Sequence, residues 1–175
     1  MNVSIRPAAL SDIPAITRIY AHAVTHGTAS FELEAPTEAD MRKRMETLLA
    51  GRFPYIVAEL DGTVVGYAYA GPYRARPAYR FTVEDSIYVD PNIQRRGVGR
   101  ALLARPIVEC EKRGFRQMIA VIGDSAQAGS IAVHRAAGFH YVGNIQNVGY
   151  KFDRWLDSVL MQRPLGDGAL TKPAR

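Results

Sequence analysis

Apolar and polar positions along the chain follow two periods. Apolar residues that recur every three to four positions predict helices, at 13–23, 37–49, 97–113 and 130–137. Apolar or alternating runs predict strands, at 3–6, 55–60, 64–70, 81–89, 117–122, 141–148 and 155–161. The order is β-α-α-β-β-β-α-β-α followed by two more strands, so we expect one mixed sheet with helices packed on it.

Local signals mark the ends of several of these elements. Ser11-Asp12 before Pro14 is a helix start, and Thr37 with Asp40 three positions later resembles a capping box. Asp61-Gly62 is a hairpin dipeptide between two strands. No repeat or linker interrupts the order, so residues 1–163 are expected to form a single domain. Residues 164–175 contain Gly, Pro and charge and predict a loose tail.

Composition narrows the class of protein. With 47% hydrophobic and 22% charged residues among 175, the chain has ordinary globular usage, and no apolar run approaches the roughly 18 residues of a membrane span. The first residues do not resemble a signal peptide, so we expect a cytoplasmic location. The single Cys110 allows no intrachain disulfide, has no neighbours at metal-ligand spacing, and is expected to be core packing. We therefore expect no metal.

The formal net charge of +5 favours anionic partners. The basic residues are scattered and lack aromatic interleaving, so we do not expect a nucleic-acid surface. A phosphate-bearing cofactor is the simpler interpretation.

The stretch 89–100 has the chemistry of a phosphate site. Gly97 and Gly99 remove side chains at a predicted helix start, where the first N–H groups lack internal partners and the helix dipole is positive. Arg95, Arg96 and Arg100 add charge around a bound anion. The stretch lacks the Lys-Ser/Thr ending of a P-loop and the third glycine of a dinucleotide fingerprint.

Residues 94–99, Gln-Arg-Arg-Gly-Val-Gly, match the Gln/Arg-x-x-Gly-x-Gly/Ala signature of the GNAT acetyltransferases. Further segments resemble the phosphinothricin and methionine sulfoximine acetyltransferases of that superfamily, at 28–32, 71–76, 82–89, 123–125, 134–139 and 149–155. The resemblance implies an α+β (α/β mixed) GNAT fold with a mostly antiparallel mixed sheet of about seven strands and about four helices. It also implies acetyl-CoA as cosubstrate, a small amino-acid-like acceptor, and a homodimer.

The resemblance implies a set of cofactor contacts. Backbone of the fourth strand pairs with the pantetheine arm, here Ile87, Tyr88 and Val89, and the loop wraps the pyrophosphate, here Gln94, Arg95, Arg96, Gly97, Val98, Gly99 and Arg100. Ser130 is expected to contact the cofactor as well. The family usually has an Asn after its fifth strand, whereas this chain has Gln127, whose longer amide is expected near the same place.

Glu84 and His134 are the candidate catalytic residues. Strand alternation puts Glu84 on the opposite face from Asp85. Glu84 is either the general base, as the resemblance implies, acting through a water or with a raised pKa, or else a solvated edge charge or a carboxylate paired with a nearby arginine. By resemblance His134 protonates the leaving thiolate, where many relatives use Tyr; a buried structural ring is the alternative. A backbone N–H of the fourth strand, that of Val89, is expected to hold the oxyanion.

Arg74, Arg76 and Arg80 form the candidate acceptor site, because guanidinium groups suit a carboxylate or phosphinate. The resemblance favours Arg74 and Arg80, and it implies that Phe31 adds an apolar wall with Asp85 close by; a core plug is the alternative for Phe31. The other functions considered are acetylation of a protein N-terminus or a polyamine, and a non-catalytic acyl-CoA sensor. The arginines argue against a polyamine, and Glu84 argues against a sensor.

Overall fold

The computed structural model describes residues 3–93 and 96–173. The strands are β1 (Val3–Pro7), β2 (Tyr55–Leu60), β3 (Thr63–Pro72), β4 (Thr82–Val89), β5 (Gln117–Gly123), β6 (His140–Lys151) and β7 (Arg154–Pro164). The helices are α1 (Ile13–His26), α2 (Glu38–Ala50), α3 (Val98–Lys112) and α4 (Ala128–Ala136), with short 3-10 turns at Leu10–Asp12, Pro77–Tyr79 and Pro91–Ile93.

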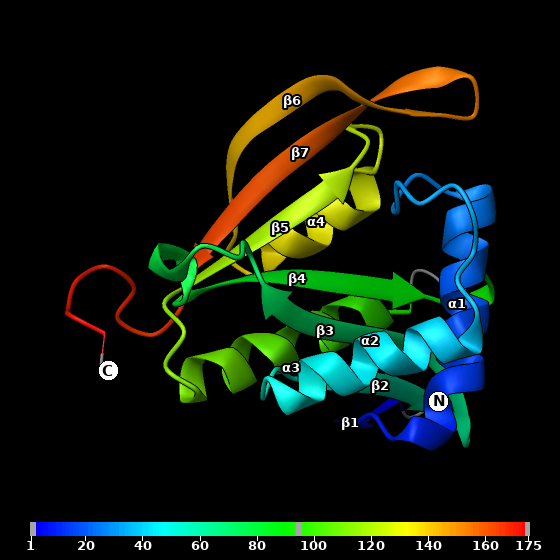
Figure 1. Ribbon diagram of the computed structural model, residues 1–175, viewed down its shortest axis with the longest axis horizontal. Helices are drawn as coiled ribbons and strands as arrows, with labels where there is room; N and C mark the ends of the chain where they lie inside the picture. Colours follow the sequence, from blue (N-terminus) through cyan, green and yellow to red (C-terminus); the bar gives the residue numbers. More distant parts are fainter. Residues whose placement is uncertain (1–2, 94–95, 174–175) are drawn as a thin grey trace.

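All seven strands form one sheet in the order β1-β2-β3-β4-β5-β7-β6. Neighbouring strands are antiparallel except β4 and β5, which are parallel because α3 connects them across one face of the sheet. Figure 1 shows β4 and β5 crossing near one end and diverging toward the other. The predicted mixed sheet and its helices are confirmed.

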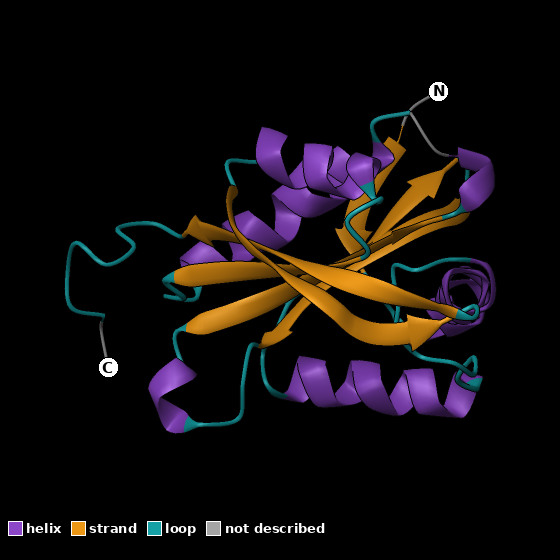
Figure 2. Cartoon of the chain, turned by 90° about the horizontal axis from the view of Figure 1, so that it is seen from above, coloured by secondary structure: helices purple, strands orange, loops and turns teal. Residues whose placement is uncertain are grey.

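Helices cover both faces of the sheet (Figure 2). Helices α1 and α2 pack on β2 and β3 through a core that includes Ile16, Met45 and Tyr67. Helix α3 packs on the other face, mainly against β2, β3 and β4, and its buried Leu103 and Cys110 belong to a core that also includes residues of β5 and β7. Cys110 is therefore core packing, as predicted, and its burial raises the pKa of the thiol to about 12.

The local signals are confirmed in detail. The backbone N–H of Asp40 donates to Oγ1 of Thr37 at 3.2 Å, closing the capping box of α2. Asp61 and Gly62 both have positive φ, as the tight turn between β2 and β3 requires. No helix within residues 3–93 and 96–173 is long and apolar enough to cross a membrane.

The structure differs from the predicted loose tail after residue 163. Strand β7 continues to Pro164, and Leu165 is fully buried in the core beneath it. Arg116 then donates to Oγ1 of Thr171 at 2.5 Å and to the carbonyl of Lys172 at 3.0 Å. A single apolar residue in a polar segment was too weak a signal to predict this attachment.

Candidate active site

The sheet opens between β4 and β5. Their pairing runs from Thr82 opposite Gln117 to Asp85 opposite Ala120, after which β4 continues along β3 and β5 along β7. The carbonyl of Thr82 and the N–H of Asp90 both bond to the β3 side. Backbone groups alternate along an antiparallel strand, so the N–H groups of Ile87 and Val89 point the other way, into the opening.

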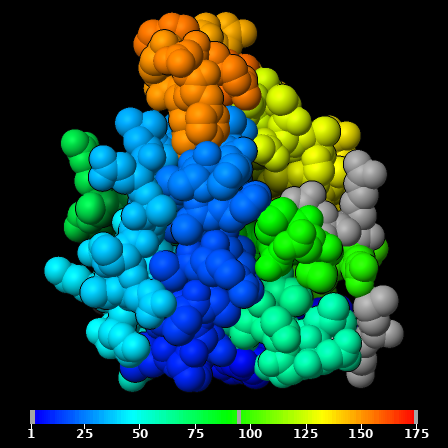
Figure 3. All heavy atoms as spheres, turned by 90° about the vertical axis from the view of Figure 1, so that its right-hand side faces the viewer, coloured from blue at the N-terminus to red at the C-terminus, as the bar shows by residue number. Residues whose placement is uncertain are grey.

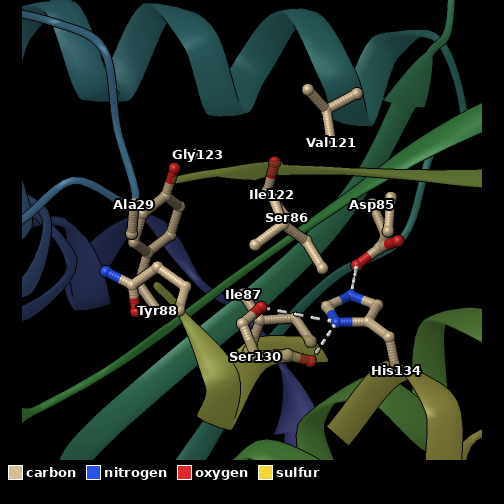
Figure 4. Close-up of a pocket in the computed structure, with 12 residues that line it drawn as sticks. Ala29, Asp85, Ser86, Ile87, Tyr88, Val121, Ile122, Gly123, Ser130 and His134 are labelled. Carbon is tan, nitrogen blue, oxygen red and sulfur yellow. Dashed lines mark hydrogen bonds and ion pairs between the residues drawn. The ribbon is translucent and has the colours of Figure 1, made fainter. Parts of the chain in front are cut away.

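A small cavity occupies this opening (Figure 4). Its lining comes from both strands, from the start of α4 and from the loop after α1: Ala29, Asp85, Ser86, Ile87, Tyr88, Ala120, Val121, Ile122, Gly123, Gln127, Ser130 and His134. Several of the residues predicted to contact the cofactor therefore lie together, although they are as far apart in the chain as Ile87 and Ser130. Gln127 also donates from Nε2 to Oγ1 of Thr28 at 2.9 Å, which ties α4 to that loop.

The predicted pyrophosphate loop leads from β4 into α3. Gly97 has φ of 77° and precedes the first helical residue, Val98, so a side chain there would be strained. The side chains of Arg96 and Arg100 are exposed at this helix start. Gln94 and Arg95, which the sequence assigned to the same role, lie outside the described residues. The structure thus places two exposed cations at the start of a helix, a combination that is typical of anion sites.

His134 is buried against Asp85. Its Nε2 lies 3.0 Å from Oδ2 of Asp85, and its Nδ1 lies 2.7 Å from the carbonyl oxygen of Ser130 (Figure 4). Burial alone would lower the pKa of His134, but the hydrogen bond and charge of Asp85 outweigh it and raise that pKa. Asp85 was predicted to lie near the acceptor, but in the structure its partner is His134. Its side chain is only 2% exposed and lies on the face of the sheet that α4 covers.

Glu84 lies on the opposite face of β4, half-buried and without an ion-pair partner among the described residues. Among the described residues, Glu84 therefore does not form the structural salt bridge that was the alternative interpretation. Burial, followed by the charge of nearby Asp85, raises the pKa of Glu84 to about 7. Such a carboxylate exchanges protons readily near neutral pH.

An aromatic hollow of about 400 Å³ lies on the same face as Glu84. Four tyrosines from α1, β2 and β3 line it, together with residues of α2: Tyr20, Tyr55, Tyr67, Tyr69, Met41, Lys43, Arg44, Thr47 and Leu48. Gly71 lies directly opposite Glu84 in the pairing of β3 with β4. A Cβ atom on Gly71 would lie 3.1 Å from the side chain of Leu48. The hollow therefore reaches the backbone beside Glu84.

The three arginines predicted to bind the acceptor lie on the exposed loop between β3 and β4. The guanidinium of Arg74 lies 5.1 Å from the ring centre of Tyr73, and that of Arg80 lies 4.6 Å from that of Phe81. Arg76 is exposed. Neither the cavity nor the aromatic hollow includes these three residues in its lining.

Phe31 packs on backbone rather than on the hollow. A Cβ on Gly123 or on Gly149 would collide with its ring, so both glycines leave room for it. Lys151 fixes the same loop by donating from Nζ to the carbonyls of Gly27 at 3.0 Å and Ser30 at 2.7 Å. Figure 3 shows the result: the blue loop after α1 meets the orange hairpin of β6 and β7.

The fold and this opening define the class of protein. The model of the GNAT acetyltransferase family matches residues 16–139, and the chain belongs to that family. It is an acetyltransferase, and the resemblance read from the sequence is confirmed.

Three relatives are particularly similar. The phosphinothricin N-acetyltransferase of Alcaligenes faecalis is 52% identical over 93% of this chain and 82% of its own length. The L-methionine sulfoximine/L-methionine sulfone acetyltransferase of Salmonella typhimurium is 40% identical over 95% and 97%. A crystal structure of a phosphinothricin acetyltransferase from Sinorhizobium meliloti, in complex with AcCoA, superimposes with a TM-score of 0.97 at 47% identity, covering 100% of this chain and 95% of that one.

Two parts of the site were missed in the sequence. The aromatic hollow draws its tyrosines from three elements, and in each element their spacing is that of ordinary core residues. The clamp by Lys151 joins positions more than 120 residues apart. The one usable signal was the alternation of Tyr55, Tyr67 and Tyr69 on predicted strands, which places three polar-tipped rings on one face.

Proposed function

We propose that this acetyltransferase moves the acetyl group of acetyl-CoA to the amino group of a small amino-acid-like acceptor of the phosphinothricin, methionine sulfoximine or methionine sulfone type. The observation that carries the proposal is the opening between β4 and β5, with Ile87 and Val89 N–H groups directed into it and the raised pKa of Glu84 on the adjoining face. The names of the similar proteins support this class of acceptor. The biological role we propose is resistance to herbicide-like amino acids in the cytoplasm.

The residues divide the work of direct transfer in a ternary complex. When bound, acetyl-CoA supplies a thioester carbonyl that the amine attacks. The start of α3, with Arg96 and Arg100, binds the pyrophosphate, and the N–H groups of Ile87 and Val89 bind the arm and the developing oxyanion. Glu84 accepts the proton of the acceptor ammonium through a water. His134 returns a proton to the thiolate.

For the acceptor, the aromatic hollow beside Glu84 suits an apolar chain, and the exposed loop of Arg74, Arg76 and Arg80 supplies cations for an acidic group that arrives there. Release of free thiol from acetyl-CoA tests this directly against phosphinothricin, methionine sulfoximine, methionine sulfone, ordinary amino acids, spermidine and an N-terminal peptide. We expect fast turnover of the first three. Turnover of the peptide or spermidine alone would show that the proposed class of acceptor is wrong. No turnover of any amine would indicate an acyl-CoA sensor.

Substitution of Arg100 tests the pyrophosphate site. Arg100→Ala removes an exposed charge from the first turn of α3, and we expect about tenfold weaker acetyl-CoA binding by calorimetry, since a charge-assisted hydrogen bond contributes about 1.5–3 kcal/mol. Arg105→Ala is the control, because Arg105 lies further along the same helix and pairs with Glu109 at 3.2 Å. Equal affinities in the two variants would remove Arg100 from the site.

We also propose that the chain forms a homodimer through the β6 and β7 hairpin. Strand β6 is one of the two edge strands of the sheet, and large apolar side chains are exposed along this hairpin, including Tyr141 at 57% and Trp155 at 61%. We expect Trp155→Arg to convert a particle of two chains to one in light scattering. Leu170→Arg, at a 92% exposed position after β7, is the control and should leave the mass unchanged. A wild-type particle of one chain would overturn this assembly.

A further inference from the structure

The ring of His134 lies between two hydrogen-bond acceptors. A carbonyl oxygen, that of Ser130, lies 2.7 Å from Nδ1, and a carboxylate oxygen, Oδ2 of Asp85, lies 3.0 Å from Nε2. A neutral imidazole has one N–H and one lone pair, so it can donate to only one of them. Both contacts are hydrogen bonds only if one further proton is retained between Nε2 and Oδ2.

The surroundings favour keeping this proton on the ring. The side chains of His134 and Asp85 are 5% and 2% exposed, so an uncompensated lone pair facing a carboxylate would be poorly screened. From α4, Oγ of Ser130 lies 3.4 Å from Nδ1, and the ring of Phe139 makes a T-shaped contact with the imidazole. On the α3 side Cys110 is a buried neutral thiol, and Glu84 lies beyond Asp85 on the other face of the sheet.

We propose that Asp85 is a positioning residue that fixes the His134 ring and keeps its second proton in place, so that the pair is a buried proton reservoir for the departing thiolate. The inference rests on the proposed function. It also explains why a carboxylate is buried on the face opposite Glu84, where it serves no acceptor.

The proton balance of a turnover is simple. As the thioester carbon–sulfur bond breaks, the thiolate takes the Nε2 proton, the one held against Oδ2 of Asp85. This leaves His134 neutral, with its Nδ1–H on the Ser130 carbonyl, and CoA as the free thiol. The acceptor ammonium loses two protons on the side of Glu84, across the sheet: the first loss frees the amine for attack, and the second accompanies formation of the amide. His134 then regains a proton from solvent through the opening, because the neutral ring leaves a lone pair against Asp85. Per turnover two protons leave the acceptor nitrogen, one reaches the thiol and one is released to solvent, and no oxidant is required.

The charge state of the ring is measured by nitrogen NMR of protein labelled at its histidines, of which there are four. The His134 signal is assigned by its loss in His134→Asn. In wild type we expect both ring nitrogens to stay protonated above the usual midpoint near pH 6.5, and in Asp85→Asn we expect the midpoint to fall by about 1 to 3 pH units. Asp12→Asn, a buried carboxylate bonded to Arg6 in the β1 region, is the matched control and should change nothing at His134.

Kinetics separates positioning from a purely structural role. We expect the alkaline fall of kcat to move to lower pH in Asp85→Asn by the same amount as the NMR midpoint. At pH 8 the kcat should then be about tenfold lower for each pH unit by which that midpoint falls. The KM of the acceptor should hold.

Two results would overturn the proposal. A uniform loss of kcat at every pH would make the pair structural, and a wild-type His134 that is neutral at pH 7 would leave no proton to deliver. The wild-type titration needs no acceptor and uses His134→Asn only to assign the signal, so its failure is distinct from a failure of the proposed acetyl transfer.

Discussion

Replacing Glu84 by Gln should lower kcat/KM about 100-fold, the range for removal of a general base. The amide keeps the size of the side chain but cannot accept a proton. The pKa of Glu84 is raised to about 7, so wild-type activity should rise tenfold per pH unit below pH 7 and level off above it. Thiol release measured from pH 5.5 to 9 should show this limb in wild type and lose it in Glu84→Gln.

Glu59→Gln provides the control for this substitution. Glu59 lies on β2 and accepts from Nε of Arg6 at 2.8 Å, far along the sheet from the opening. Its replacement should leave both the rate and the acid limb unchanged. A Glu84→Gln enzyme that keeps the acid limb would assign that proton transfer to another group, even if its rate were low.

Glu84 and His134, the two groups proposed to transfer protons, lie on opposite faces of the sheet. Alternation along β4 directs Glu84 toward the aromatic hollow and Asp85 toward His134 and α4. In the proposed mechanism the acceptor therefore loses its protons on one face, and the thiolate gains one on the other. For this mechanism the opening between β4 and β5 must be accessible from both faces of the sheet. The acetyl group would be transferred within that opening.

Local chemistry explains what was predictable from the sequence. The capping box at Thr37, the turn at Asp61 and the glycine helix start at Gly97 depend on neighbours within a few residues, and each was found where expected. Periodicity then supplied the order of the elements. The resemblance added the place of the opening, which no periodicity shows.

Contacts between distant segments explain what was not predictable. The pairing of His134 with Asp85 depends on α4 lying against one particular face of β4, and the sequence shows only that Asp85 and Glu84 face opposite ways. The arginines of the loop before β4 were chosen by charge and by resemblance, and neither shows which way an exposed loop turns. Phe31 was expected at the acceptor by resemblance; its ring fills the space left by two glycines, a contact between distant segments that the sequence does not show.

Gly123→Ala should displace the loop after α1. The added Cβ would collide with the backbone carbonyl of Thr28 and lie 2.8 Å from the ring of Phe31. The loop has no easy retreat, because Lys151 holds the carbonyls on both sides of Thr28 and Ala29. We expect a loss of about 2 kcal/mol in the free energy of unfolding. Calorimetry should show a Tm lower by about 4–8 °C.

The same displacement should reach the cofactor, since Ala29 lines the cavity between β4 and β5. We expect the KM of acetyl-CoA to rise about tenfold, the equivalent of roughly 1.4 kcal/mol of binding. Gly143→Ala is the matched control, because nothing lies within 4 Å of the position its Cβ would take on β6. If both variants kept the wild-type Tm and KM, the loop would not be clamped between Gly123 and Lys151. Its position would then not contribute to the binding of acetyl-CoA.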